Sequence, residues 1–281
     1  MTHYNNASQL DKLTLGQTTT YTGTYDPNLL QGVPRSLNRN ELKLNDASLP
    51  FNGQDIWYGY ELSWLNNKGK PIVAVAEFTF SCKSSHMVES KAFKLYLNSY
   101  NQSRFTSAQA VEHQLQHDLS AISGAPSQVK LFTLDQCQPL AIRSLEATCI
   151  DNIDIEITHY QLQPSLLRTM NDNNIVSESL VSHLLKSNCL ITNQPDWATV
   201  YINYRGNKIV HSALLQYLVS FRQHNEFHEQ CVERIFCDIL NYCNPQELTI
   251  YARYTRRGGL DINPFRTTTT NKAPFARTLR Q

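Results

Sequence analysis

The sequence predicts an α+β protein that contains two copies of one unit, each with the order strand–strand–helix–helix–strand–strand. Segments rich in Val, Phe, Tyr and Trp indicate strands in both halves of the chain. Apolar residues spaced three and four apart indicate helices between them. The second half also repeats the first at a constant offset, which is typical of an internal duplication.

The first half begins with a polar segment, residues 1–50, which Pro34 and Pro50 interrupt. We expect this segment to be an arm with loops. A Lys-Gly-Lys-Pro turn at 68–71 separates the first two strands. We expect strands at 57–65, 72–82 and 129–134, and an amphipathic helix at 107–122.

The second half follows the same order, with an Arg-Gly-Asn-Lys turn at 205–208 and two glycines, Gly258 and Gly259, after its last strand. We expect strands at 150–160, 197–204 and 248–254, and helices at 212–222 and at about 226–243.

The two halves align at an offset of 121 residues. Residues 92–100 lie over 213–221, and Val111-Glu112 lies over Val232-Glu233. A chance match is the alternative to duplication. We place an N-terminal unit at 1–145 and a C-terminal unit at 146–281. Because the reactive side chains differ between the copies, we expect each copy to contribute part of one site at their interface.

Composition excludes several classes of protein. The chain has 281 residues, of which 41% are hydrophobic and 17% charged, so it is globular and not disordered. A net charge of +1 gives no electrostatic case for nucleic-acid binding. No signal peptide or membrane-spanning run is predicted. Seven cysteines without a C-x-x-C pair favour a reducing cytoplasm over a disulfide framework.

Four side chains of the second half form a set suited to covalent catalysis: Cys189, Asp196, His228 and Glu229. A small buried hydrophobe is the alternative interpretation of any cysteine. Asp196 lies between a proline and Trp197, where partial burial would raise its pKa towards a value useful for proton transfer. The alternative is an ordinary turn aspartate.

Two further patterns favour phosphate binding. Lys91 and Lys94 are three residues apart, which on a helix places both ammonium groups on one face. Arg256 and Arg257 precede Gly258, and glycine lets a backbone approach a ligand closely. A solvated lysine face and a plain glycine turn are the corresponding alternatives.

The patterns examined for metal binding give no site. Position 232 is valine, so His228-Glu229 does not begin an H-E-x-x-H motif. His113 and His117 have no obvious third ligand, and Cys231, Cys237 and Cys243 do not share a helix face. The glycines form no G-x-G-x-x-G loop, so a nicotinamide cofactor would not be held in a Rossmann site.

Over nearly its whole length, the sequence resembles the two-copy form of the QueF nitrile reductases, the NADPH-dependent 7-cyano-7-deazaguanine reductases. The run Glu89-Ser90-Lys91-x-x-Lys94 distinguishes this family from the related GTP cyclohydrolase type I enzymes. No catalytic position departs from the family pattern. The resemblance is carried by residues 34–39, 60–65, 89–99, 189–197, 221–236 and 251–265.

The resemblance implies a tunnelling fold, in which each copy is an antiparallel sheet backed by two helices and the active sites lie where copies meet. It also implies the reduction of the nitrile of a free deazapurine base to a primary amine with two NADPH, within queuosine biosynthesis. The partners implied are the small deazapurine substrate and a second copy of the chain in a homodimer, without direct nucleic-acid or membrane contact.

Residue roles follow from the same resemblance. Cys189 would attack the nitrile to form a covalent thioimide, Asp196 would protonate the nitrogen, and His228 would assist proton handling and orient the substrate. Glu89 and Glu229 would accept hydrogen bonds from the guanine-like edge. NADPH phosphates would be held by Ser90, Lys91, Lys94 and Arg257, with Gly258 beside them and Arg256 as a weaker candidate.

Two other functions are compatible with the sequence. One is a cyclohydrolase-like or pterin-pathway enzyme on the same fold, which would need a zinc site of cysteines and histidine. The other is a non-catalytic binding module that keeps the purine pocket, which the presence of both Cys189 and Asp196 disfavours.

Overall fold

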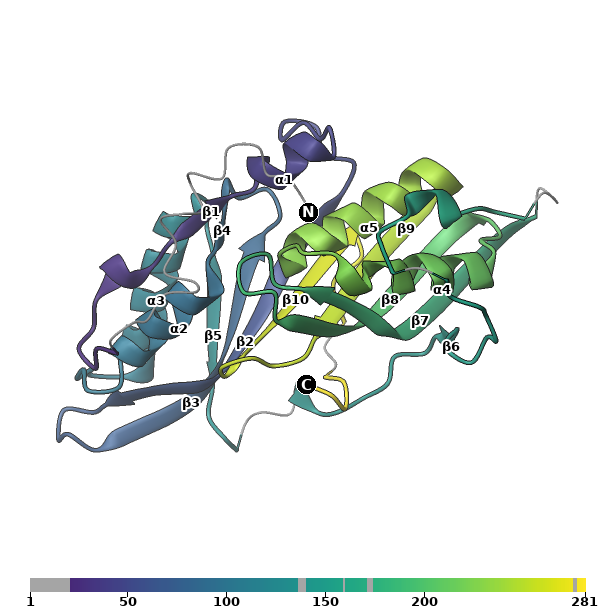
Figure 1. The fold of residues 1–281 in the computed structure, drawn as a ribbon. Coiled ribbons are helices and arrows are strands. Elements are labelled where there is room, and N and C mark those ends of the chain that lie inside the picture. Colours follow the sequence, from purple (N-terminus) through teal and green to yellow (C-terminus); the bar gives the residue numbers. More distant parts are fainter. Residues whose placement is uncertain (1–20, 136–139, 159, 171–173, 275–276) are drawn as a thin grey trace.

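The computed structural model of this chain describes residues 21–281 except 136–139, 159, 171–173 and 275–276. Its central feature is one eight-stranded sheet with the strand order β5-β3-β2-β10-β9-β8-β7-β6 (Figure 1). Neighbouring strands are antiparallel, except that β6 runs parallel to β7. The strands are β1 Gly32–Pro34, β2 Asn52–Leu65, β3 Pro71–Ser81, β4 His86–Val88, β5 Gln128–Phe132, β6 Thr148–Cys149, β7 Ile175–Asn188, β8 Pro195–Asn207, β9 Glu247–Tyr254 and β10 Leu260–Thr267.

Two pairs of helices pack on the sheet, and they begin at matching places in the two halves. The start of α2 and the start of α4 are separated by the 121 residues that the sequence alignment gave. In the described residues, the order strand–strand–helix–helix–strand therefore occurs twice. The α-helices are α1 Ser36–Glu41, α2 Ser90–Ser99, α3 Ala108–Ser123, α4 His211–Val219 and α5 His228–Cys243, and short 3-10 turns lie at Pro27–Leu29, Pro164–Leu166 and Ser220–Gln223.

Local sequence explains where the predicted helix of the first half begins and ends. The hydroxyl of Ser107 accepts a hydrogen bond from the Ala110 N–H at 3.1 Å and so caps α3. The helix ends at Gly124, whose φ of 73° lies in the left-handed region. Val111, Leu115 and Leu119 point inward and are fully buried, so the amphipathic pattern is confirmed.

The sheet has two differently covered faces. Helices α2 and α3 pack with Trp57, Phe78 and their neighbours in one core, and α4 and α5 pack with Val200, Ile250 and their neighbours in another. The opposite face carries Tyr58, Tyr201, Tyr251 and other residues, which loop residues such as Leu140 and Ala273 cover. Since β10 pairs with β2 on one side and β9 on the other, the sheet joins the two halves.

Several sequence expectations are wrong in detail. The described residues of 150–160 do not form a strand, and the short strand β6 precedes them. Ile150, Ile153 and Ile155 pack on the core from irregular chain, because Asp and Asn between them favour turns. The expected turn at 205–208 lies largely within β8, which continues to Asn207.

The arm and two strands also differ from expectation. The described part of the N-terminal arm contains β1 and α1, and its first 20 residues lie outside the described residues. The long strand β7 and the strand β10 were not predicted. Both carry polar or charged residues among apolar ones, which hid the alternating pattern. Among the described residues, no helix combines the length and apolarity needed to cross a membrane.

Candidate active site

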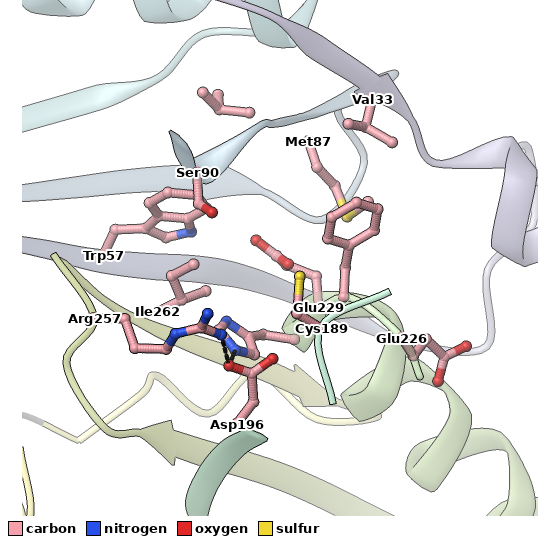
Figure 2. A pocket seen from close by; sticks show the side chains of 13 residues that line it. Val33, Trp57, Met87, Ser90, Cys189, Asp196, Glu226, Glu229, Arg257 and Ile262 are labelled. Atoms are coloured by element: carbon pink, nitrogen blue, oxygen red, sulfur yellow. Dashed lines mark hydrogen bonds and ion pairs between the residues drawn. The ribbon is translucent and has the colours of Figure 1, made fainter. Parts of the chain in front are cut away.

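A pocket lies between the two halves of the sheet (Figure 2). Strand β10 pairs with β2 of the N-terminal half. Helix α5, which begins at His228, contacts β10. Both halves contribute side chains, as the duplication predicts for a site at the interface. The lining residues are Val33, Trp57, Met87, Val88, Ser90, Cys189, Asp196, Glu226, Phe227, His228, Glu229, Arg257 and Ile262.

The hairpin between β7 and β8 brings the cysteine and the aspartate together. The chain leaves β7 at Asn188 and returns at Pro195, and these two residues are paired in register. A tight turn closes the loop, because the Cys189 N–H donates to the carbonyl of Gln194 at 2.8 Å. Cys189 and Asp196 are 9% and 3% exposed and line the same pocket.

His228 begins α5 and faces the aspartate. Its Nε2 lies 3.3 Å from Oδ1 of Asp196. The imidazole ring stacks on Tyr254, with ring centroids 4.0 Å apart. The ring is therefore held between a buried aromatic side chain and a buried carboxylate, which is the orientation that a proton-transfer group requires.

The pKa of Asp196 differs from the sequence expectation. The residue is buried as predicted, and burial raises its pKa, but His228 and Arg257 together outweigh this effect and hold the pKa below its usual value. Arg257 also contacts Asp196 directly. The carboxyl group is thus ionised near neutral pH, so the expected raised pKa is wrong. An ionised carboxylate carries no proton to donate, so proton donation at this position would need the partner His228 as well.

Glu229 lies in the first turn of α5 and is 4% exposed. Burial, and next the negative charge of Asp55, raise the pKa of Glu229 to about 7. This carboxyl group therefore changes its charge near neutral pH. When ionised it offers two acceptor oxygens to the pocket, and when protonated it offers a donor.

A buried ion-pair network lies behind Glu229, one helical turn along α5. Glu233 accepts hydrogen bonds from Arg39 at 2.7 Å and from Arg266 at 2.8 Å. Asp55 pairs with Arg35 and, at 2.7 Å, with the same Arg266. The network joins α1, β2, β10 and α5, and so ties both halves together at the pocket.

The Glu-Ser-Lys-x-x-Lys run forms the start of α2. Glu89 is its N-cap and accepts hydrogen bonds from the backbone N–H of Lys91 at 2.9 Å and of Ala92 at 2.7 Å. Burial raises the pKa of Glu89. Its neighbours Val88 and Ser90 line the pocket, whereas Glu89 and Lys91 do not.

The predicted phosphate-binding residues of the two halves meet beside the pocket. Gly258 has a φ of 56°, and a Cβ added there would approach the side chain of Lys94 to 2.9 Å. Burial, and then the charge of Arg257, lower the pKa of Lys94. Arg257 itself contacts Asp196 and Gln194. Lys94, packed against Gly258, and Arg257 therefore lie close together, and two neighbouring cations suit an anionic cofactor.

Arg256, the weaker candidate, stacks on Tyr60 at 4.3 Å and does not line the pocket. Sequence reasoning missed the apolar walls, which Trp57, Phe227 and Ile262 provide among others. Phe227 precedes His228, so the motif could have indicated it. Trp57 carried no signal beyond its place in a predicted strand, and Ile262 lies in β10, which was not predicted.

A thiol, a carboxylate–imidazole pair and a titratable carboxyl group around one pocket are groups that covalent catalysis by a cysteine would use. Comparisons with known proteins show the family. Residues 21–131 match a family model described as "Nitrile reductase, 7-cyano-7-deazaguanine-reductase N-term", and residues 195–273 match one described as "QueF-like protein".

Two curated relatives cover the chain almost completely, and each is called "NADPH-dependent 7-cyano-7-deazaguanine reductase". The protein of Colwellia psychrerythraea (strain 34H / ATCC BAA-681) is 63% identical over 100% of both chains. That of Hydrogenovibrio crunogenus (strain DSM 25203 / XCL-2) is 54% identical over 98% of both. The chain belongs to the family of NADPH-dependent 7-cyano-7-deazaguanine reductases.

Proposed function

We propose that this chain reduces the nitrile of 7-cyano-7-deazaguanine to the aminomethyl group with NADPH, as a step of queuosine biosynthesis for tRNA modification. Both relatives are named for this reductase activity. The observation that carries the proposal is that Cys189 and the Asp196–His228 pair line one pocket. The described group of side chains that could hold a metal, Cys149, Asp151 and His183, does not line this pocket, so it does not favour the cyclohydrolase-like enzyme.

The first chemical step makes the nitrile a better hydride acceptor. The Sγ of Cys189 bonds to the nitrile carbon, and one π bond of the C≡N group breaks. The Asp196–His228 pair supplies the proton that the nitrile nitrogen takes up, and the pair is restored by the proton of the thiol. The product is a thioimide, in which Cys189 is joined to the carbon of a C=N–H group.

Each NADPH, when bound, supplies one hydride. The first hydride and a proton convert the thioimide to a tetrahedral amine that still carries the sulfur. Cys189 then leaves as the thiol, and an imine remains. A second hydride and a second proton give the aminomethyl product, so one nitrile, two NADPH and two protons are consumed. The Asp196–His228 pair again handles the proton at nitrogen.

The buried carboxyl groups of Glu229 and Glu89 recognise the base. The guanine-like edge presents N–H and amino donors, and an ionised carboxylate accepts two such hydrogen bonds. Glu229 lines the pocket and is suited to this role. Glu89 caps α2 but keeps further lone pairs, so we retain it as a second acceptor beside the pocket. His228 orients the base next to Cys189.

Binding of the nitrile base is expected to weaken as the pH falls through about 7. The reason is that only ionised Glu229, whose pKa is about 7, accepts both hydrogen bonds. Below this pH the dissociation constant should rise roughly tenfold per pH unit. Calorimetric titration of a Cys189→Ala protein between pH 5.5 and 8 measures binding without covalent reaction.

The control is the same titration with Glu229→Gln added. An amide cannot ionise, so binding is weaker at high pH and the residual affinity is flat with pH. If the dissociation constant of that variant still changed with pH as before, the pH dependence would belong to another group. Glu229 would then not be the residue that recognises the base.

We assign the NADPH phosphates to Ser90, Lys91, Lys94, Arg257 and Gly258, because the cations Lys94 and Arg257 of the two halves lie close together beside Gly258. Lys91→Ala is expected to raise the KM for NADPH about 10- to 100-fold, since a hydrogen bond to a charged group contributes about 1.5–3 kcal/mol. The KM for the nitrile should stay within about twofold. Steady-state kinetics with each substrate varied in turn measures both values.

Lys68→Ala is the matched control, because Lys68 lies in the exposed turn between β2 and β3. It should leave both KM values unchanged. Equal rises of both values in Lys91→Ala would contradict the phosphate assignment.

We further propose that each half, 1–145 and 146–281, is a tunnelling-fold unit and that two chains form a homodimer. The repeated element order supports the first point. The open edge of the described sheet at β5, which pairs only with β3, supports the second. The described cysteines are free, which favours a cytoplasmic location. Sedimentation analysis of the purified protein tests the dimer.

The decisive experiment supplies purified protein with 7-cyano-7-deazaguanine and NADPH. We expect two NADPH to be oxidised for each aminomethyl product identified by mass spectrometry. Folded protein that binds the nitrile but oxidises no NADPH would overturn the proposed function.

A further inference from the structure

A second group of reactive side chains lies outside the pocket, at the edge of the sheet in the C-terminal half. The potential ligand atoms of Cys149, Asp151 and His183 all lie within 4.8 Å of one another. None of the three residues lines the pocket that contains Cys189. Cys149 and His183 are exposed and Asp151 is half-buried, so solvent ions reach the group.

Strand β6 and the turn that follows it carry two of these side chains, Cys149 and Asp151. It runs parallel to β7, with Cys149 beside Val181, and the Ile150 N–H continues the pairing by donating to the Val181 carbonyl at 3.0 Å. Ile150 is buried in the core on the helix side of the sheet. Because successive side chains of an extended chain alternate, Cys149 points to the opposite side. Asp151, in the turn that follows, is held near it by hydrogen bonds from Ser182 and His183.

A β-bulge in β7 brings the third side chain to the same place. The register of β7 against β8 shifts between Ser182 and Leu185, and His183 lies in this bulge. Bulges re-aim side chains and free backbone groups from the ladder. Here the freed His183 N–H donates to Oδ2 of Asp151 at 2.8 Å.

Hydrogen bonds from residues outside the group orient the side chains of Asp151 and His183. Ser182 donates to Oδ1 of Asp151 at 2.6 Å, which leaves each carboxylate oxygen a further lone pair. Nδ1 of His183 lies 2.9 Å from the hydroxyl of Thr199. When Nδ1–H donates to Thr199, the lone pair of Nε2 is available to a metal. Arg280 fixes the backbone by donating to the His183 carbonyl at 2.6 Å.

We propose that Cys149, Asp151 and His183 bind a divalent cation of the zinc class, with a water molecule as the fourth ligand. Thiolate, imidazole and carboxylate are the three ligand types that Zn²⁺ takes in proteins. Metal–ligand bonds of about 2.0–2.3 Å in a tetrahedron place ligand atoms roughly 3.3–3.8 Å apart, so the three side chains close by about 1 Å. The ion joins the two-residue strand β6 to the bulge of β7.

The test is zinc binding by the purified full-length chain, stripped with chelator and then dialysed against a Zn²⁺ buffer. We expect one zinc per chain by elemental analysis. Replacing Zn²⁺ with Co²⁺ should give a thiolate-to-cobalt absorption band. Cys149→Ser and His183→Gln should each lower the zinc affinity by more than the roughly 10- to 100-fold expected for Thr199→Val, which removes only the hydrogen-bond partner of a ligand.

His117→Gln is the matched control, because His117 is another exposed histidine in contact with an aspartate, Asp118. It should leave zinc binding unchanged. Absence of stoichiometric zinc in the wild-type chain would overturn the proposal. So would a cobalt band that survives Cys149→Ser and disappears in Cys189→Ala, since the metal would then be bound in the active-site pocket. Reductase activity is measured in a separate assay. Neither its loss nor its presence shows whether these three residues bind zinc.

Discussion

Cys189→Ala is expected to lower the rate of NADPH oxidation by a factor on the order of 10⁴ or more, because no other group replaces the sulfur that attacks the nitrile. The variant should still bind the nitrile base, since the other residues that line the pocket remain. Mass spectrometry of the protein incubated with nitrile alone should show a covalent adduct in the wild type and none in the variant.

Cys231→Ala is the matched control for this experiment. Cys231 lies in α5, and its N–H donates to the carbonyl of Phe227, which lines the same pocket. Burial raises the pKa of the Cys231 thiol to about 12, which leaves almost no thiolate at neutral pH. The control should keep both the adduct and the turnover. An active Cys189→Ala enzyme, or an adduct that persists in it, would exclude Cys189 as the nucleophile.

Glu233→Ala is expected to lower the free energy of unfolding by about 3–5 kcal/mol. Glu233 is 2% exposed and pairs with both Arg39 and Arg266, and removing one partner leaves buried charges without compensation. Because the network spans both halves, unfolding should remain a single transition at a lower denaturant concentration. Urea titration followed by circular dichroism measures the change.

Asp46→Ala provides the comparison, since Asp46 pairs with the same Arg39 at 2.8 Å but its side chain is 57% exposed. Exposed pairs contribute about 0–1 kcal/mol. If Glu233→Ala does not fold, Glu233→Gln keeps the shape and removes the charge, and it should still lose more stability than Asp46→Ala. Equal losses in the two variants would show that the network adds nothing to an ordinary surface pair.

The elements with a strong local pattern were predicted well. The helix at 107–122 and the strands at 57–65 and 72–82 correspond to α3, β2 and β3. Their apolar residues repeat with the period of the element, so local sequence is sufficient. The predicted strand at 150–160 failed because its isoleucines reach the core from irregular chain. A segment in which half of the residues are apolar can bury those residues either as a strand or as irregular chain. Only the packing of neighbouring segments decides between the two conformations.

The sequence identified the reactive side chains of the candidate site but not all of their environment. Cys189, Asp196, His228 and Glu229 line the same pocket. The direction of the Asp196 pKa could not be predicted, because it depends on His228 and then on Arg257, both far along the chain from Asp196. Likewise, the pKa of Glu229 depends on its burial and then on Asp55, which belongs to the other half.

The sequence by itself determined the α+β class, the repeat at 121 residues, the chemical groups available and the family. Each of these follows from residue type and spacing along the chain. Only the tertiary structure decided which groups meet: the pairing of β10 with β2, the ion-pair network around Glu233, and the group formed by Cys149, Asp151 and His183. Contacts between residues far apart depend on strand register and packing, which no local pattern encodes.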